Sequence, residues 1–190
     1  MTTLLLLPLL LAGPSTAPLP GTSLYQLDAA WTDQHGRATK LADLRGRVVL
    51  VAMVFTNCRY ACPRMVERMK RVEASLSPTE RRRMRFLLVS LDPARDTVPV
   101  LAAFAKSSQL NSGWWTLLRG APDAVRELSA ALGVRYKQVD SGDLAHANLL
   151  TMLDAGGSVA HQQEGLESDV NPMLIAVRAE LARTGDTKPK

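Results

Sequence analysis

The two cysteines of the chain, Cys58 and Cys62, lie four positions apart. A continuous apolar run, 48–55, precedes them, and an amphipathic pattern follows from Pro63 to about Leu76. This order predicts a buried strand that leads directly into a helix. If the helix begins near Cys58, the two side chains share one face with Cβ atoms about 5–6 Å apart, a gap that a disulfide or a metal can bridge.

A helix N-terminus also changes the chemistry of a thiol. Its unpaired N–H groups and partial positive charge lower the thiol pKa and favour the thiolate, which attacks disulfides and binds soft metals. Cys58 would then be the attacking thiol of a redox pair and Cys62 the resolving one, with a Cys58–Cys62 disulfide as the oxidised form. Two buried cysteines that act as small hydrophobes, or an inert structural disulfide, are the alternatives.

A third ligand must come from elsewhere in the chain. His146 follows a polar stretch, 140–143, and precedes an apolar run, 147–153, so it stands at the mouth of a predicted strand. His35 lies in a polar turn and is expected to be solvated, and His161 is expected on the surface of a terminal hairpin. His146 is therefore the candidate third metal ligand.

Asp92 is a candidate supporting residue. It ends the predicted strand 86–91, at the carboxyl edge of the sheet where α/β folds place their sites. There it is positioned to orient His146 as a hydrogen-bond partner behind the metal. A simple Asp-Pro turn with Pro93 at the strand end is the alternative.

The remaining pattern alternates strands and helices. Strands are predicted at 48–55, 86–91, 114–118, 147–153 and 158–162, and helices at 63–76, 98–106, 123–132 and 169–183, after a short hairpin within 25–39. On the first helix the apolar residues face one side and Arg64, Arg68 and Arg71 the other. The fold class is α/β, with a central mixed sheet flanked by helices and an N-terminal hairpin extension.

The length and composition of the chain indicate its domain organisation. The 190 residues, 46% hydrophobic and 22% charged, suit one globular domain, which we place at 21–185 with a polar tail at 186–190. Residues 1–20 contain the apolar run Leu4–Ala12, too short for a membrane span of about 20 residues but suited to a signal peptide. Export is therefore expected, and whether the leader is cleaved or kept as a tether stays open.

The net charge of the chain indicates which classes of binding partner are compatible with it. The 23 basic and 18 acidic residues give a net charge of +5, which permits an acidic partner or a membrane surface without requiring one. The cluster Arg81, Arg82, Arg83 and Arg85 predicts a solvated face, with a docking patch as the alternative. Because no aromatic residues interleave with the basic ones, nucleic acid is not expected as a partner.

The order of these motifs resembles the Sco/SenC family of copper-binding, thioredoxin-like assembly proteins of cytochrome oxidase. The resemblance covers about residues 24–176 and is carried by four stretches: 41–50, the CxxxCP motif at 58–63, 90–97 and 146–154. It departs from the family at Arg59, where a proline usually follows the first cysteine, and in the short apolar leader.

The resemblance implies a copper site and a function. Cys58, Cys62 and His146 would ligate Cu(I) or Cu(II), a donor set that suits both oxidation states, whereas zinc and iron–sulfur centres usually need four protein ligands. The family implies a thioredoxin-like fold and a metallochaperone that delivers copper to an apo copper protein, a respiratory oxidase subunit. We expect the protein to be a monomer. A thiol–disulfide oxidoreductase that reduces the cysteines of such a partner is the alternative.

Overall fold

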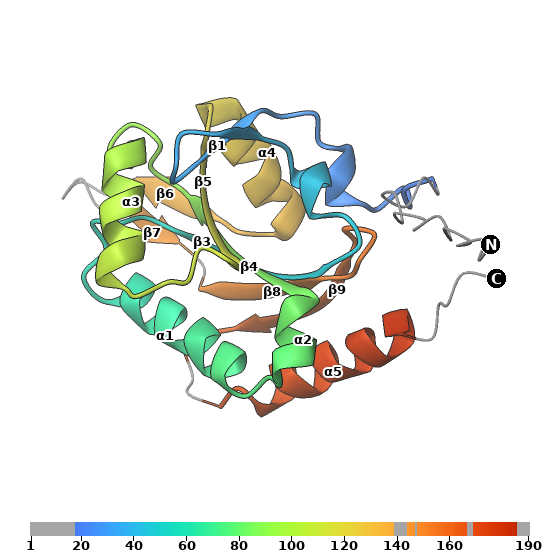
Figure 1. Ribbon diagram of the computed structural model, residues 1–190. Helices are drawn as coiled ribbons and strands as arrows, with labels where there is room; N and C mark the ends of the chain where they lie inside the picture. The colour runs from blue at the N-terminus through green and yellow to red at the C-terminus, as the bar shows by residue number, and fades with distance from the viewer. Residues whose placement is uncertain (1–17, 139–143, 147, 167–168, 186–190) are drawn as a thin grey trace, which may run out of the picture.

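The computed structural model describes residues 18–138, 144–146, 148–166 and 169–185 (Figure 1). Most of the predicted leader, the polar stretch 140–143 and the tail 186–190 lie outside the described residues. The domain expected at 21–185 therefore covers nearly all of the described structure.

A seven-stranded mixed sheet forms the centre, in the order β2-β1-β5-β4-β3-β8-β9. Its three middle strands, β5, β4 and β3, run parallel, and the outer strands join them antiparallel. The predicted N-terminal hairpin is present as β1 and β2, with Trp31 opposite Thr39. The strands span Trp31–Asp33 (β1), Ala38–Thr39 (β2), Val48–Val54 (β3), Met84–Ser90 (β4), Trp115–Gly120 (β5), Leu149–Leu153 (β8) and Val159–Glu164 (β9).

Helices cover both faces of the sheet. Alternate residues of β3 point to opposite sides: Leu50 packs in one cluster with residues of α1, α3 and α5, and Val51 packs in the other with α4 and the N-terminal segment. The helices are α1 (Ala61–Ala74), α2 (Pro78–Arg82), α3 (Val98–Ser107), α4 (Pro122–Leu132) and α5 (Asn171–Gly185), with 3-10 turns at Leu24–Gln26 and Leu41–Leu44 (Figure 1). The predicted α/β class and sheet are confirmed.

Helix α1 differs from its prediction at one residue, Arg68. Its predicted apolar face, with Met65, Met69 and Val72, is buried as expected. Arg68, predicted on the polar face, is instead fully buried. Arg68 follows Met65 by three residues, so helical spacing places Arg68 at the border of the apolar stripe. The segment that contains Gly165 packs against Arg68 there and covers the side chain.

The carboxylate of Glu73 links α1 to the sheet. It accepts hydrogen bonds from the indole N–H of Trp114 and from that of Trp115, each at 2.6 Å. Trp115 also stacks on Phe86, with ring centroids 4.9 Å apart. One side chain of α1 thus holds two consecutive residues at the start of β5.

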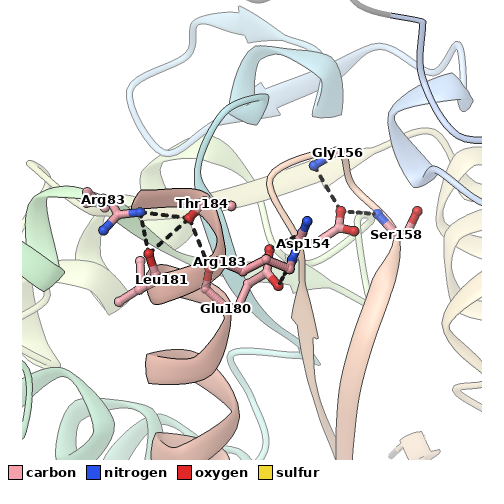
Figure 2. A network of polar contacts seen from close by, with 8 residues as sticks. All are labelled: Arg83, Asp154, Gly156, Ser158, Glu180, Leu181, Arg183 and Thr184. Carbon is pink, nitrogen blue, oxygen red and sulfur yellow. Dashed lines mark hydrogen bonds and ion pairs between the residues drawn. The ribbon is translucent and has the colours of Figure 1, made fainter. Parts of the chain in front are cut away.

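The arginines at 81–85 do not form one solvated face. Only Arg82 is exposed. Arg83 donates from Nη2 to the carbonyl of Leu181 at 2.6 Å and to the hydroxyl of Thr184 at 2.7 Å, which ties the segment before β4 to the end of α5 (Figure 2). The 3-10 turns and the short helix α2 were not predicted, nor was a separate two-stranded sheet of β6 (Tyr136–Gln138) and β7 (Leu144–His146).

The turn between β8 and β9 supports the N-terminal segment. The Asp154 carboxylate accepts from the backbone N–H groups of Gly156 and Ser158, both at 2.9 Å (Figure 2). Gly157 has φ +86°, and a Cβ built there would lie 2.6 Å from the ring of the buried Tyr25. The turn thus needs glycine both for its backbone conformation and for the close approach of that ring.

We predict that Gly157→Ala lowers the free energy of unfolding by about 2–4 kcal/mol, because left-handed strain adds to overpacking against Tyr25. Gly133→Ala is the matched control, since Gly133 also has a positive φ, +73°, but faces open space. The control should cost about 1 kcal/mol. Urea denaturation of both variants measures this, and equal losses would contradict the contact with Tyr25.

Candidate functional site

The cysteines occupy the turn between β3 and α1. The Cys58 N–H donates to the carbonyl of Phe55 at 3.2 Å, which closes a turn directly after the strand. Helix α1 begins at Ala61, three residues later than the start assumed near Cys58. Cys58 therefore lies before the helix and Cys62 in its first turn, so the two do not share a helix face as i and i+4.

This arrangement makes Cys58 an acceptor at the helix N-terminus. The backbone N–H of Cys62 donates to the Cys58 sulfur at 3.3 Å. Partial burial acts to raise the pKa of Cys58, but hydrogen bonds from the backbone of Cys62 and Tyr60, and from the Cys62 side chain, outweigh it and hold the pKa below its usual value. The sequence-based expectation of a thiolate-favouring site at Cys58 agrees with this geometry.

Cys62 has the opposite environment. Its residue is 1% exposed, and it packs in the core between α1 and the sheet. Burial raises the pKa of the Cys62 thiol strongly, and the nearby Cys58 sulfur and Asp96 carboxylate raise it further. Both cysteines are free thiols here. The pair therefore combines a half-exposed sulfur that ionises easily with a buried sulfur that retains its proton.

Asp96 was not singled out from the sequence. It is 1% exposed and accepts hydrogen bonds from the hydroxyls of Thr56 and Ser90, each at 2.5 Å. Thr56 follows β3 and Ser90 ends β4, so Asp96 fastens the two strand ends beside the cysteine turn. The available signal was its place in the polar segment that follows a buried parallel strand.

Asp92 forms a local turn. Its carboxylate pairs with the guanidinium of Arg95, and its backbone N–H donates to the Ser90 hydroxyl at 3.0 Å. The Asp-Pro turn considered from the sequence is therefore present. The role of Asp92 in orienting His146 stays a prediction.

The structure describes the backbone of His146, which ends β7 and lies opposite Tyr136 of β6. The strand that follows, β8, begins only at Leu149. Antiparallel pairing of Leu150 with Ala52 brings the start of β8 level with the end of β3, where the cysteine turn begins. The side chain of His146 is outside the described structure, so its role as a ligand stays a prediction.

The other histidines lie as follows. His35 is exposed, as expected for a polar turn, and His161 is half-buried on β9, opposite Met152. Among the side chains that the structure describes, no group of three or more His, Cys, Asp or Glu residues is placed to hold a metal ion. Cys58 and Cys62 are thus the described part of the candidate site.

The surface beside Cys58 is open and positively charged. Tyr60 is 64% exposed, and the Arg64 guanidinium lies 4.3 Å above its ring. Arg59 is also exposed. A cavity of about 470 Å³ is lined by residues such as Leu91, Arg119 and Val125 and includes neither cysteine. Cys58 is itself partly exposed, so a partner can approach it beside the exposed side chains of Arg59 and Tyr60.

Comparisons with known proteins agree on one family. Residues 22–181 match the sequence model of a family described as SCO1/SenC. A SCO1 protein homologue of Bacillus subtilis is 27% identical over 139 residues, which are 72% of this chain and 72% of the relative.

Solved structures agree in fold. Arabidopsis thaliana ScoI with copper bound matches with a TM-score of 0.69 at 16% identity, over 82% of this chain and 96% of that one. BsSco, described with a disulfide switch and as a member of the Sco family of cytochrome c oxidase assembly proteins, matches with a TM-score of 0.71 at 23% identity, over 83% and 94%. These likenesses confirm the thioredoxin-like fold.

The unequal environments of the two sulfurs predict unequal alkylation. The thiolate is the reactive form, so the lowered pKa of Cys58 should move the midpoint of its rate against pH below the value of about 8.5 for a free cysteine. Cys62, buried and with a raised pKa, should stay unlabelled in the folded protein.

Mass spectrometry of iodoacetamide-treated, reduced protein across a pH series measures both rates. Labelling in denaturant is the control and should modify both residues equally. Equal rates in the folded protein would contradict the assigned environments.

Proposed function

The chain belongs to the SCO1/SenC family, and from that membership we propose that it is a copper chaperone. It binds Cu(I) or Cu(II) through Cys58, Cys62 and His146 and delivers the ion to the copper site of a respiratory oxidase subunit. The observation that carries the proposal is the Cys58 sulfur, which accepts the Cys62 N–H at the start of α1 beside a second, buried sulfur. The copper-bound relative and the family's role in oxidase assembly support it.

The donor chemistry fits copper. Thiolates are soft ligands that select Cu(I), and an added imidazole allows the same site to hold Cu(II). Metal ligands bind deprotonated, so copper displaces the proton that Cys62 retains in the free protein. Cys58, already favoured as thiolate, provides the first sulfur for the incoming ion.

The unequal exposure of Cys58 and Cys62 suits the delivery of copper to an acceptor protein. Copper bound between the two sulfurs is reached from solvent on the Cys58 side, beside Tyr60 and Arg59. A ligand of the acceptor protein can replace Cys58 first, while the buried Cys62 keeps hold of the ion. Transfer by stepwise ligand exchange then needs no release of free copper.

A thiol–disulfide oxidoreductase is the second candidate, favoured by the split in pKa between the sulfurs. The Cys58 thiolate attacks a partner disulfide, forms a mixed disulfide and releases one partner thiolate. Cys62 then loses its proton and attacks the Cys58 sulfur, which releases the second partner thiol. Two electrons pass to the partner, and the Cys58–Cys62 disulfide remains.

We also propose that the protein acts outside the cytoplasm, as a monomer that approaches the membrane surface of its partner. The apolar run Leu4–Ala12 supports export, and disulfide-forming pairs persist in oxidising compartments. In the described part of the chain, no helix has the length and apolar character to span a bilayer.

Substitution of the ligands separates the two functions. His146→Ala should lose Cu(II) affinity severely, keep part of its Cu(I) affinity and retain most disulfide exchange, because two thiolates still hold Cu(I). Cys58→Ser should abolish all three, and the oxidised Cys58–Cys62 form should bind no copper until it is reduced.

Copper titration with optical and spin-resonance detection, run beside a disulfide-reduction assay, measures these effects. His161→Ala is the matched control and should behave as the parent. If His146→Ala binds both copper states as the parent does, the ligand assignment is wrong and the oxidoreductase becomes the better proposal.

Export predicts where the full chain accumulates. The full-length protein should fractionate outside the cytosol, and a variant that lacks residues 1–17 should remain inside, since the apolar leader is removed. Immunoblots of the fractions measure this. Full-length protein found only in the cytosol would refute export.

A further inference from the structure

We propose that Arg68 is a positioning residue of the copper site, which fixes the chain next to His146 relative to the two cysteines. The inference rests on the proposed function, because it concerns the position of His146 relative to the sulfur ligands of the proposed copper site. Arg68 acts through the backbone of the strands.

The burial of Arg68 first requires an explanation. Its residue is 0% exposed, on α1, six positions beyond Cys62. A guanidinium removed from water costs several kcal/mol unless hydrogen bonds and charges compensate it, and Arg is almost never fully buried unless paired. A leucine or methionine would fill the same space without this cost. The charged group is therefore expected to hold something in place.

Arg68 binds the chain at the end of β9. Its Nη1 donates to the carbonyl of Gly165 at 2.9 Å. Gly165 directly follows Glu164, the last residue of β9, and has φ +91°, so it turns the chain away from the strand at this point. The guanidinium thus ties α1 to the residue where β9 ends.

From Gly165 the link continues to the neighbour of His146. The N–H of Gly165 donates to the carbonyl of Asn148 at 2.8 Å. Asn148 precedes β8 and stands two positions after His146. Two consecutive hydrogen bonds therefore connect the helix that carries Cys62 to the backbone beside the proposed third ligand.

The sheet register places this link at the edge of the sheet where β3 ends. Ala52 pairs with Leu150 and Val51 with Thr151, so continued pairing brings Asn148 level with Val54, the last residue of β3. The cysteine turn starts directly after Val54. The link thus fixes the start of β8 level with the start of that turn.

This role predicts a selective effect on copper. Cu(I) can be held by the two thiolates alone, but Cu(II) prefers nitrogen donors and depends on the imidazole. Loss of a residue that orients a ligand typically lowers metal affinity by about 10–100-fold. Arg68→Met should therefore weaken Cu(II) binding by that factor, alter its optical and spin-resonance spectra, and leave Cu(I) affinity near that of the parent.

Two further variants make the test specific. Arg68→Lys keeps a donor for the Gly165 carbonyl and should recover part of the Cu(II) affinity, and it covers the case in which Arg68→Met does not fold. Arg83→Met is the matched control, because Arg83 also binds a backbone carbonyl, that of Leu181, but at the far end of α5. It should leave both copper affinities and the Cu(II) spectrum unchanged.

Hydrogen exchange provides a readout without copper. The Gly165 amide should exchange faster in Arg68→Met than in the parent and in Arg83→Met, because the guanidinium of Arg68 no longer binds the Gly165 carbonyl. Unchanged exchange at Gly165, or an equal loss of Cu(I) and Cu(II) affinity that follows the loss of stability, would overturn the proposal.

The His146→Ala variant, measured in parallel, distinguishes a failure of the Arg68 inference from a failure of the proposed function. If His146→Ala loses Cu(II) affinity and both Arg68 variants keep it with the parent spectrum, the inference fails and the proposed function stands. If His146→Ala itself keeps Cu(II) affinity, the ligand assignment fails, and the positioning role of Arg68 fails with it.

Discussion

Burial of β3 on both faces is the constraint from which the rest of the site follows. Each of its seven residues is buried, so helices must cover both sides of the sheet and parallel neighbours must flank the strand. The chain can leave such a strand only at an edge, where it turns into α1. That turn delivers Cys58 to a helix N-terminus and Cys62 into the core.

Much of this arrangement could be predicted from the sequence. The eight-residue apolar run rich in valine predicted the central strand, and the cysteines that follow it were located in the correct turn. The periodic apolar pattern predicted α1 because that helix buries one stripe of residues, Met65, Met69 and Val72 among them. The short helix α2 buries none of its residues, so its sequence carries little signal.

The details of the site depended on contacts between distant segments. The start of α1 was expected three residues early because apolar spacing does not register a turn such as that from Phe55 to Cys58. Asp96 read as an ordinary polar residue until the ends of β3 and β4 enclosed it. Arg68 read as a surface residue because only the fold brings Gly165 against it. Polar residues that become buried through tertiary packing are those that sequence periodicity misplaces.

The carboxylate that joins Trp114 and Trp115 gives the protein an internal optical probe. The chain has three tryptophans, and two of them donate to Glu73 on the helix that carries Cys62. Indole emission responds to a neighbouring charge, so their fluorescence depends on whether α1 stays docked on β5. The signal comes from the opposite end of α1 from the sulfurs. Intrinsic emission can therefore distinguish a helix that has moved from a thiol pair that has changed only its chemical state.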